Sequence, residues 1–353
     1  QEADIKILCA LKGFAFWHTF PMLREYLSGA AASSLHEARL IAEEMSVEAH
    51  TYCPVYKQEE FQQLLFYSRY LTFNSLSQYS ELCGLVKSSG KAASLGIRIN
   101  PEYSEVKTDL YNPARTGSRL GIVRSQLGEN LPQGIEGLHF HVLCENDSYT
   151  LERTLWETEK KFDRLIRQAK WVNMGGGHLI TRNGYNVEHL VELLRDFRKR
   201  YPNLEEIILE PGEAIGWQTG FLVASVQDII PCGDIQIAML DTSFACHMPD
   251  CLEMPYKPDI LHSREPKKED KYVYRMGGNS CLAGDFMGMG DYAFDEPLTT
   301  GSKIVFEDMA HYTMVKTTFF NGVQHPHIAV WTKEDELLLL RSFGYEDYKG
   351  KLS

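Results

Sequence analysis

The chain has 353 residues, of which 44% are hydrophobic and 24% are charged, and its formal net charge is −12. This is the composition of an ordinary globular protein that is long enough for two domains. No apolar run reaches the roughly 18 residues of a membrane-spanning helix, and the acidic balance disfavours nucleic acid as a partner. The eight cysteines form no CxxC pair, so we expect neither a zinc ribbon nor a disulfide scaffold and predict a cytoplasmic protein.

The first 212 residues alternate short apolar runs with amphipathic stretches, a pattern typical of β/α units. The predicted strands are residues 5–11, 29–34, 47–53, 70–75, 94–101, 135–143, 170–176 and 205–212. The segments between them are predicted as helices, the clearest being Val187–Arg200, which Asn186 would cap and Pro202 would end. Eight such units within about 210 residues predict a (β/α)8 barrel.

After residue 221 the pattern changes to apolar runs that read as strands without helices. These predicted strands are residues 221–230, 235–240, 272–276, 303–307, 313–320 and 328–331. Strands that follow an α/β region in this way indicate a separate domain. We therefore expect a barrel over residues 1–213 and an all-β domain, sandwich-like or barrel-like, over residues 214–353.

Chemically useful residues follow several of the predicted barrel strands, at the end of a barrel where active sites lie. Lys12 ends the first strand, where burial would lower the pKa of its amine and make it nucleophilic. Gly175, Gly176 and Gly177 follow the seventh strand, and their backbone N–H groups could hold a phosphate. Glu210 ends the eighth strand, where a carboxylate could keep a pyridine nitrogen protonated. The alternatives are that Lys12 only reaches solvent at the barrel rim, that the three glycines form an ordinary flexible loop, and that Glu210 only pairs with a charge at the barrel end.

His139 and His141 form an HxH pair on the sixth predicted strand. Such a pair could suggest a metal site, but barrel metallohydrolases carry it on the first strand with further histidines later. We therefore predict no metal, and expect His141 to stack on a cofactor ring while His139 packs in the core. Arg98 ends the fifth strand and would face the same site.

The predicted β domain holds two further candidates. Cys281 lies in a loop of small residues, 278–285, and its thiol could donate a proton. Tyr312 could donate a hydrogen bond to a phosphate. The alternatives are an inert buried cysteine and a tyrosine that only packs.

Taken together, these motifs resemble those of the fold type III decarboxylases, which depend on pyridoxal 5′-phosphate (PLP) and have the alanine racemase-like fold. The matching motifs, in family order, are residues 10–12, 137–141, 175–177, 210–212, 281–285 and 309–313. They span nearly the whole chain, and six motifs in order are far more specific than any one. Residues 10–15, 246–250, 252–256 and 280–285 are similar to the branch that acts on carboxynorspermidine or carboxyspermidine.

The resemblance implies a role for each candidate. Lys12 would carry PLP as a Schiff base, His141 would stack on its ring with Arg98 nearby, and Glu210 would pair with the ring nitrogen. Gly175, Gly176, Gly177 and Tyr312 would hold the phosphate. Cys281 would reach the active site of a partner subunit and protonate the product, so the working unit would be a homodimer. The reaction implied is decarboxylation of carboxynorspermidine or carboxyspermidine to norspermidine or spermidine.

The sequence also departs from the family pattern. Glu213 replaces a phosphate-binding arginine, and Leu282 stands where relatives place an acid for a short amine tail. Residues 142–144 also differ, and the family's usual N-terminal segment, which contributes to the β domain, is absent from this sequence. For a longer polyamine tail the candidate partners are Asp241, Asp250, Glu253 and Asp285.

Rival functions remain open at this point. The first is a decarboxylase of another amino acid such as diaminopimelate or ornithine, which only substrate contacts distinguish. A racemase of the same fold is disfavoured because Glu210 would make the ring a strong electron sink. A PLP-carrier protein is disfavoured by the β domain, and an unrelated barrel hydrolase would require the motif order to be accidental.

Overall fold

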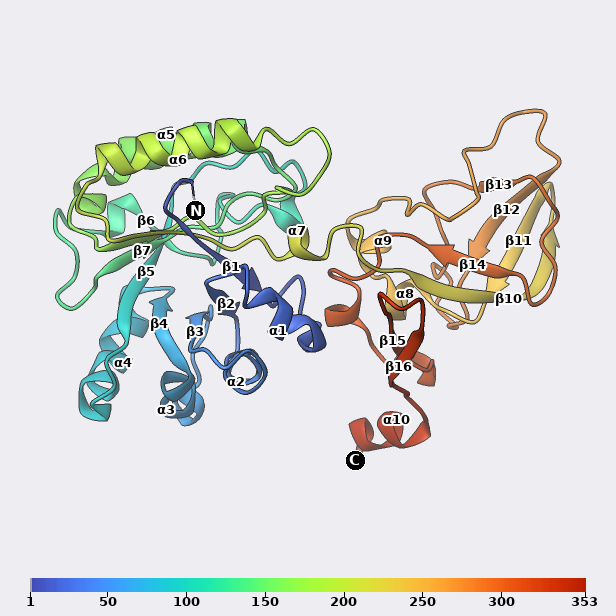
Figure 1. Cartoon of the computed structure of the whole chain (residues 1–353), viewed down its shortest axis with the longest axis horizontal. Coiled ribbons are helices and arrows are strands. Elements are labelled where there is room, and N and C mark those ends of the chain that lie inside the picture. The colour runs from blue at the N-terminus through green and yellow to red at the C-terminus, as the bar shows by residue number, and fades with distance from the viewer. Residues whose placement is uncertain (1) are drawn as a thin grey trace. The chain divides into compact units, whose positions relative to one another are not determined.

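The computed structural model describes residues 2–353 and divides the chain into two compact units, one ending at Trp217 and the other running from Gln218 to Ser353. Figure 1 shows the elements of both units in chain order. Among the described residues, no helix combines the length and the apolar composition that a membrane crossing requires.

The first unit contains a closed barrel of parallel strands. Its strands are β1 (Lys6–Ala10), β2 (Gly29–Ala32), β3 (Ala49–Tyr52), β4 (Ser68–Phe73), β5 (Ser94–Asn100), β7 (Gly137–His139), β8 (Trp171–Asn173) and β9 (Glu206–Leu209). They run in the order β4-β3-β2-β1-β9-β8-β7-β5, and pairing of β4 with β5 closes the ring. A short strand, β6 (Ile122–Val123), pairs in parallel with the end of β5. The predicted barrel is confirmed, with a strand in each of the eight expected places.

Helices connect most of these strands. They are α1 (Phe20–Leu23), α2 (Leu35–Leu40), α3 (Gln58–Tyr67), α4 (Leu76–Ser89), α5 (Ser148–Ile166), α6 (Val187–Arg200) and α7 (Glu213–Gly216). The α6 helix has the predicted bounds because the Asn186 side chain caps it, accepting the His189 N–H at 3.0 Å. It lies beside α5 on the outside of the barrel (Figure 1).

One expected helix is missing. Between β5 and β7 the only helical structure in the described chain is two short 3₁₀ turns, Asp109–Tyr111 and Arg124–Gln126. The prediction of a helix between every pair of strands was therefore wrong here. Pro101, Pro113 and Pro132 interrupt this segment, and each removes a backbone donor that a helix would need.

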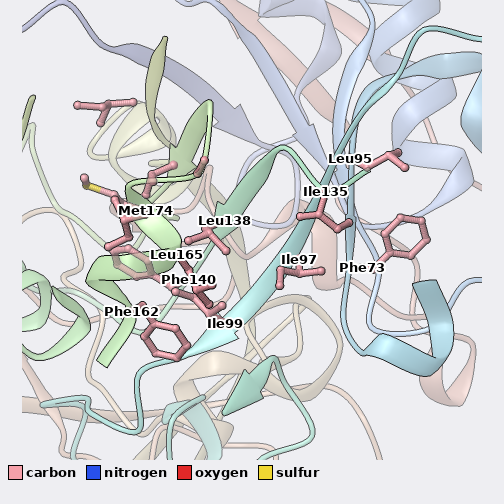
Figure 2. Close-up of a cluster of buried hydrophobic side chains, with 14 of the residues drawn as sticks. Phe73, Leu95, Ile97, Ile99, Ile135, Leu138, Phe140, Phe162, Leu165 and Met174 are labelled. Atoms are coloured by element: carbon pink, nitrogen blue, oxygen red, sulfur yellow. The ribbon is translucent and has the colours of Figure 1, made fainter. Parts of the chain in front are cut away.

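Two apolar clusters stabilise the barrel. The larger one lies between the strands and the surrounding helices, and Figure 2 shows the part that includes Leu138, Phe140 and Phe162. The second joins Leu8, Ala31, Tyr70, Trp171 and Ile208. Tyr70 and Trp171 come from β4 and β8, which do not pair, yet their ring centroids are 5.4 Å apart. This second cluster therefore fills the barrel interior.

The second unit is built on a mixed five-stranded sheet. Its strands are β10 (Leu222–Cys232), β11 (Ile235–Leu240), β12 (Tyr272–Gly277), β13 (Tyr292–Phe294) and β14 (Lys303–Phe306). They run in the order β13-β12-β11-β10-β14, and only β11 and β12 pair in parallel. A separate hairpin joins β15 (Ile328–Trp331) to β16 (Leu337–Arg341). The sheet-rich second domain is confirmed.

The second unit differs from the prediction in detail. Residues 313–320 are not a strand but turns around the 3₁₀ helix Met314–Lys316. Lys316 bonds Glu253 there, and Phe319 stacks on His325, so tertiary contacts override the β propensity of this segment. Short helices also occur where none was predicted, namely α8 (Phe244–His247), α9 (Asp250–Glu253) and α10 (Tyr345–Leu352).

The packing of Trp171 predicts a sharp difference between two glycines. A Cβ atom at Gly137 would lie 1.9 Å from Cε2 of Trp171. A Cβ atom at Gly84 on α4 would instead meet nothing within 4 Å beyond the backbone of its own helix. We expect Gly137→Ala to lower the free energy of unfolding by about 2 kcal/mol through overpacking. The control Gly84→Ala should raise it by about 1 kcal/mol, because alanine is the better helix former. Urea unfolding followed by tryptophan fluorescence measures both, and equal stabilities would contradict this packing.

Candidate active site

Lys12 lies just beyond β1, in a turn where the N–H groups of Gly13 and Phe14 both bond the Ala10 carbonyl. The residue is exposed to solvent, although many protein groups lie around its amine. Desolvation therefore lowers the pKa of Lys12 and outweighs the opposing influence of Cys144 and Glu210. An amine with a lowered pKa has a larger neutral, nucleophilic fraction near neutral pH.

Arg98 and His141 lie next to each other at the ends of their strands. The Arg98 guanidinium, buried on β5, donates to the His141 carbonyl at 2.9 Å and lies 4.7 Å from the ring centroid of Tyr52. His141 follows β7, and its Nδ1 accepts the Gly176 N–H at 2.9 Å. Burial, with the charges of Lys12 and Arg98, holds the pKa of His141 well below its usual range. The ring is therefore neutral, and its proton lies on Nε2.

The glycine loop, Gly175, Gly176 and Gly177, packs directly on neighbouring main chain. Gly175 and Gly177 have φ of +71° and +88°, values that favour glycine. A Cβ at Gly176 would lie 2.1 Å from the Glu210 carbonyl oxygen, and one at Gly177 would lie 2.1 Å from that of Leu143. The loop is thus a close-packed turn, and its geometry requires glycine at these positions.

Glu210 follows β9 and is surrounded by polar groups. Asn173 Nδ2 donates to its Oε1 at 2.6 Å, and His139 Nε2 lies 3.6 Å from its Oε2, which is too long for a hydrogen bond. Burial alone raises the pKa of Glu210, but His139 and Asn173 more than offset this, and the pKa is lowered. A carboxylate inside the barrel end is therefore kept ionised by the polar side chains beside it.

The structure brings the barrel candidates together at the carboxyl-terminal end of the strands. They are Lys12, Arg98, His141, Gly175, Gly176, Gly177 and Glu210. Sequence reasoning missed Asn173 and Tyr52, which contact this set, and it left His139 as simple core packing. Asn173 could have been found from its position on β8. Side chains alternate along a strand, so Asn173 shares a face with Trp171 and not with Val172.

The Cys281 loop lies in the second unit and is held by two side chains. The backbone N–H of Cys281 donates to Asn321 Oδ1 at 2.7 Å, and the cysteine itself is exposed. Asp285 is buried, and its two oxygens accept the N–H groups of Ala245 and Ser280, each at 3.0 Å. Asp285 therefore shapes the loop that presents Cys281.

The other candidates of the second unit also have local contacts. Asp241 accepts the Ser225 N–H at 2.7 Å, and Lys316 Nζ bonds both Asp250 and Glu253. Tyr312 adopts a left-handed φ of +50°. Across residues 2–353 no group of three or more His, Cys, Asp or Glu side chains is arranged to hold a metal ion.

The barrel residues fit a planar heteroaromatic phosphate that carries an aldehyde. Lys12 offers an amine with a lowered pKa, and Glu210 offers an ionised carboxylate that suits a protonated ring nitrogen. The glycine loop brings bare backbone to the site where a side chain would not fit, with the N–H groups of Gly175 and Gly176 donated to Asn173 and His141. Neutral His141 accepts the Gly176 N–H of the loop and lies close enough to Lys12 for that charge to lower its pKa. These are the groups that PLP requires from a protein.

Comparison with known proteins agrees with this chemistry. Residues 33–310 match the family described as "Pyridoxal-dependent decarboxylase, C-terminal sheet domain". The chain is 51% identical over 352 residues to the carboxyaminopropylagmatine decarboxylase of Synechocystis sp., covering 100% of this chain and 89% of that protein. It is 45% identical over 359 residues to a carboxynorspermidine/carboxyspermidine decarboxylase of Campylobacter jejuni, covering 99% and 91%.

Solved structures extend the comparison. The crystal structure of carboxynorspermidine decarboxylase from Campylobacter jejuni, complexed with norspermidine, matches with a TM-score of 0.90 and 43% identity, covering 99% of this chain and 93% of that one. Diaminopimelate decarboxylase from Helicobacter pylori matches with a TM-score of 0.81 over 99% of this chain and 90% of that one, but at 17% identity it shows the fold alone. The chain belongs to the family of pyridoxal-dependent decarboxylases, which are carboxy-lyases that use PLP and have the alanine racemase-like fold.

Proposed function

We propose that this protein decarboxylates carboxynorspermidine or carboxyspermidine, releasing norspermidine or spermidine. The observation that carries the proposal is the barrel site, in which Lys12 and the ionised Glu210 lie at the same strand ends as the glycine loop, together with relatives that bear these substrate names. PLP, when bound, supplies an electron sink for the electron pair that the departing carboxylate leaves behind.

Each residue of the barrel site has a role in this proposal. Lys12 attaches the cofactor through its amine, and Glu210 holds a proton on the ring nitrogen. His141 lies against the ring face with Arg98 behind it, because Arg98 is bonded to the His141 carbonyl. The loop of Gly175, Gly176 and Gly177 holds the phosphate, aided by Tyr312. Because the N–H groups of Gly175 and Gly176 donate to Asn173 and His141, we assign the N–H of Gly177 to the phosphate. Glu213 offers no positive charge, so the loop carries more of that work.

Cys281 completes the site in the proposal. Its thiol would donate a proton to the carbon atom that has lost the carboxylate, and the amine of Lys12 would replace the product amine on the cofactor. We place Cys281 in the active site of a partner subunit, so the working unit is a homodimer with shared sites. Its exposure on a loop held by Asn321 and Asp285 suits such a contact. The scattered cysteine pattern supports a cytoplasmic location.

A second substrate deserves equal testing, because the relative at 51% identity is named carboxyaminopropylagmatine decarboxylase. That substrate shares a long tail with the carboxy-polyamines but ends in a guanidinium group. Asp241, Asp250, Glu253 and Asp285 are the proposed acidic partners of either tail. The first three are on or next to short elements of the second unit, and Asp250 and Glu253 already hold one cation, Lys316.

Substrate preference is expected to follow from Leu282, which is 46% exposed beside Cys281. A leucine leaves the ammonium of a short substrate without a partner, so kcat/KM should favour a long carboxy-polyamine over ornithine or diaminopimelate by about 100-fold. Product analysis with carboxynorspermidine, carboxyspermidine, carboxyaminopropylagmatine, diaminopimelate and ornithine measures this.

Two variants sharpen the substrate test. Leu282→Asp should raise the rate on ornithine, because it supplies the missing acid. Leu337→Asp on β16 adds the same charge to another exposed leucine of the second unit and should leave the preference unchanged. Equal rates of the unmodified enzyme on ornithine and carboxynorspermidine would overturn the carboxy-polyamine proposal while leaving the family assignment intact.

The shared site predicts complementation between inactive subunits. Lys12→Ala and Cys281→Ala should each abolish most activity alone. Random reassociation of the two should restore up to about a quarter of the unmodified activity, because half of the dimers are mixed and one of their two sites is intact. Lys12→Ala/Cys281→Ala mixed with Lys12→Ala is the inactive control. Mixed dimers that form without activity would refute the shared site.

A further inference from the structure

Asn173 is the buried amide that joins two parts of the barrel site. It ends β8 and is 4% exposed. Its Nδ2 donates to Glu210 Oε1 at 2.6 Å, and its Oδ1 accepts the backbone N–H of Gly175 at 2.9 Å. Both halves of one side chain are therefore used, one on the carboxylate and one on the glycine loop.

Main-chain contacts also join Glu210 to the glycine loop. The Glu210 N–H donates to the Gly175 carbonyl at 2.8 Å, and Gly176 packs against the Glu210 carbonyl. His139, the other polar side chain beside the carboxylate, lies 3.6 Å away and makes no hydrogen bond within the described chain. The bond from Asn173 is thus the short side-chain contact that orients Glu210.

The residue type at this position follows from its two partners. An amide donates to a carboxylate through its nitrogen and accepts a backbone N–H through its oxygen, so Asn173 serves both partners at once. Aspartate would place a second carboxylate against Glu210, and one of the two would then have to keep a proton. A leucine of similar size would leave both the carboxylate and the Gly175 N–H without their bonds.

We propose that Asn173 is a positioning residue that couples Glu210 to the glycine loop, so that the ring-nitrogen end and the phosphate end of the cofactor are held in register. This inference rests on the proposed function, in which Glu210 faces the ring nitrogen and the loop holds the phosphate. Loss of Asn173 frees the Glu210 carboxylate to rotate and loosens Gly175 at the same time.

Substitution of Asn173 separates this role from a merely structural one. Asn173→Ala should weaken PLP binding about tenfold and lower kcat about tenfold with little change in KM, as expected for the loss of a hydrogen bond to a charged group. Asn203→Ala is the matched control. Like Asn173, Asn203 makes two side-chain hydrogen bonds, in its case by donating to the carbonyls of Ile166 and Ala169. It lies before β9, at the opposite end of the strand from Glu210.

Asn173→Asp supplies a pH-dependent rescue. At about pH 6 the new carboxyl can share a proton with Glu210 and replace the lost donor, whereas at about pH 8 the two carboxylates repel each other. PLP affinity should therefore approach that of the unmodified protein at the lower pH and fall below that of Asn173→Ala at the higher pH. Matching pH profiles for the two variants would overturn the proposal.

Pyridoxal, which lacks the phosphate, tests the coupling directly. Asn173→Ala should lower the ratio of PLP affinity to pyridoxal affinity, because the phosphate loop is loosened, whereas Glu210→Gln should leave that ratio unchanged. The double variant should lose less PLP affinity than the sum of the single losses. Additive losses or an unchanged ratio in Asn173→Ala would refute the coupling. Failure of the unmodified protein to bind PLP would instead refute the proposed function.

Discussion

The active site depends on the close approach of the glycine loop to the main chain at the ends of its neighbouring strands. Side chains at Gly176 and Gly177 would overlap the carbonyls of Glu210 and Leu143, so the loop can lie there only as bare backbone. This contact requires β7, β8 and β9 to be adjacent, as the closed barrel makes them. Through it, loop N–H groups fix the ring of His141 and the amide of Asn173. One backbone contact therefore positions groups that arise from three strands.

Burial then sets the charge state of these groups. Desolvation lowers the pKa of Lys12, His139 and His141, which favours the neutral histidines and enlarges the neutral fraction of the Lys12 amine. For Glu210 the charged form is favoured instead, because His139 and Asn173 offset its desolvation and lower its pKa. The same pH therefore yields a nucleophilic amine and a carboxylate able to hold a proton on a ring nitrogen. These are the two properties that a PLP decarboxylase needs from its barrel.

The sequence predicted the parts of this protein that periodicity or strand-end position reveals. All eight barrel strands and the bounds of α6 were correct, because buried strands and an amphipathic, capped helix leave strong local patterns. Lys12 and Glu210 could be proposed from the sequence because each directly follows a strand, as the structure places them. The segment after β5 and residues 313–320 were wrong, since prolines and tertiary contacts decided them. Asn173 was missed because its importance lies in contacts with Gly175 and Glu210, which no local pattern encodes.

The most direct test of this account is the position at which PLP attaches. The protein should be incubated with PLP, reduced with borohydride and mapped by peptide mass spectrometry. Lys12 should carry the pyridoxyl group, because desolvation lowers the pKa of its amine. Lys170, only two residues before Val172 on the same barrel, is the internal control, since its pair with Glu136 raises its pKa and keeps it protonated. A label on Lys170 or Lys6 in place of Lys12 would contradict the site described above.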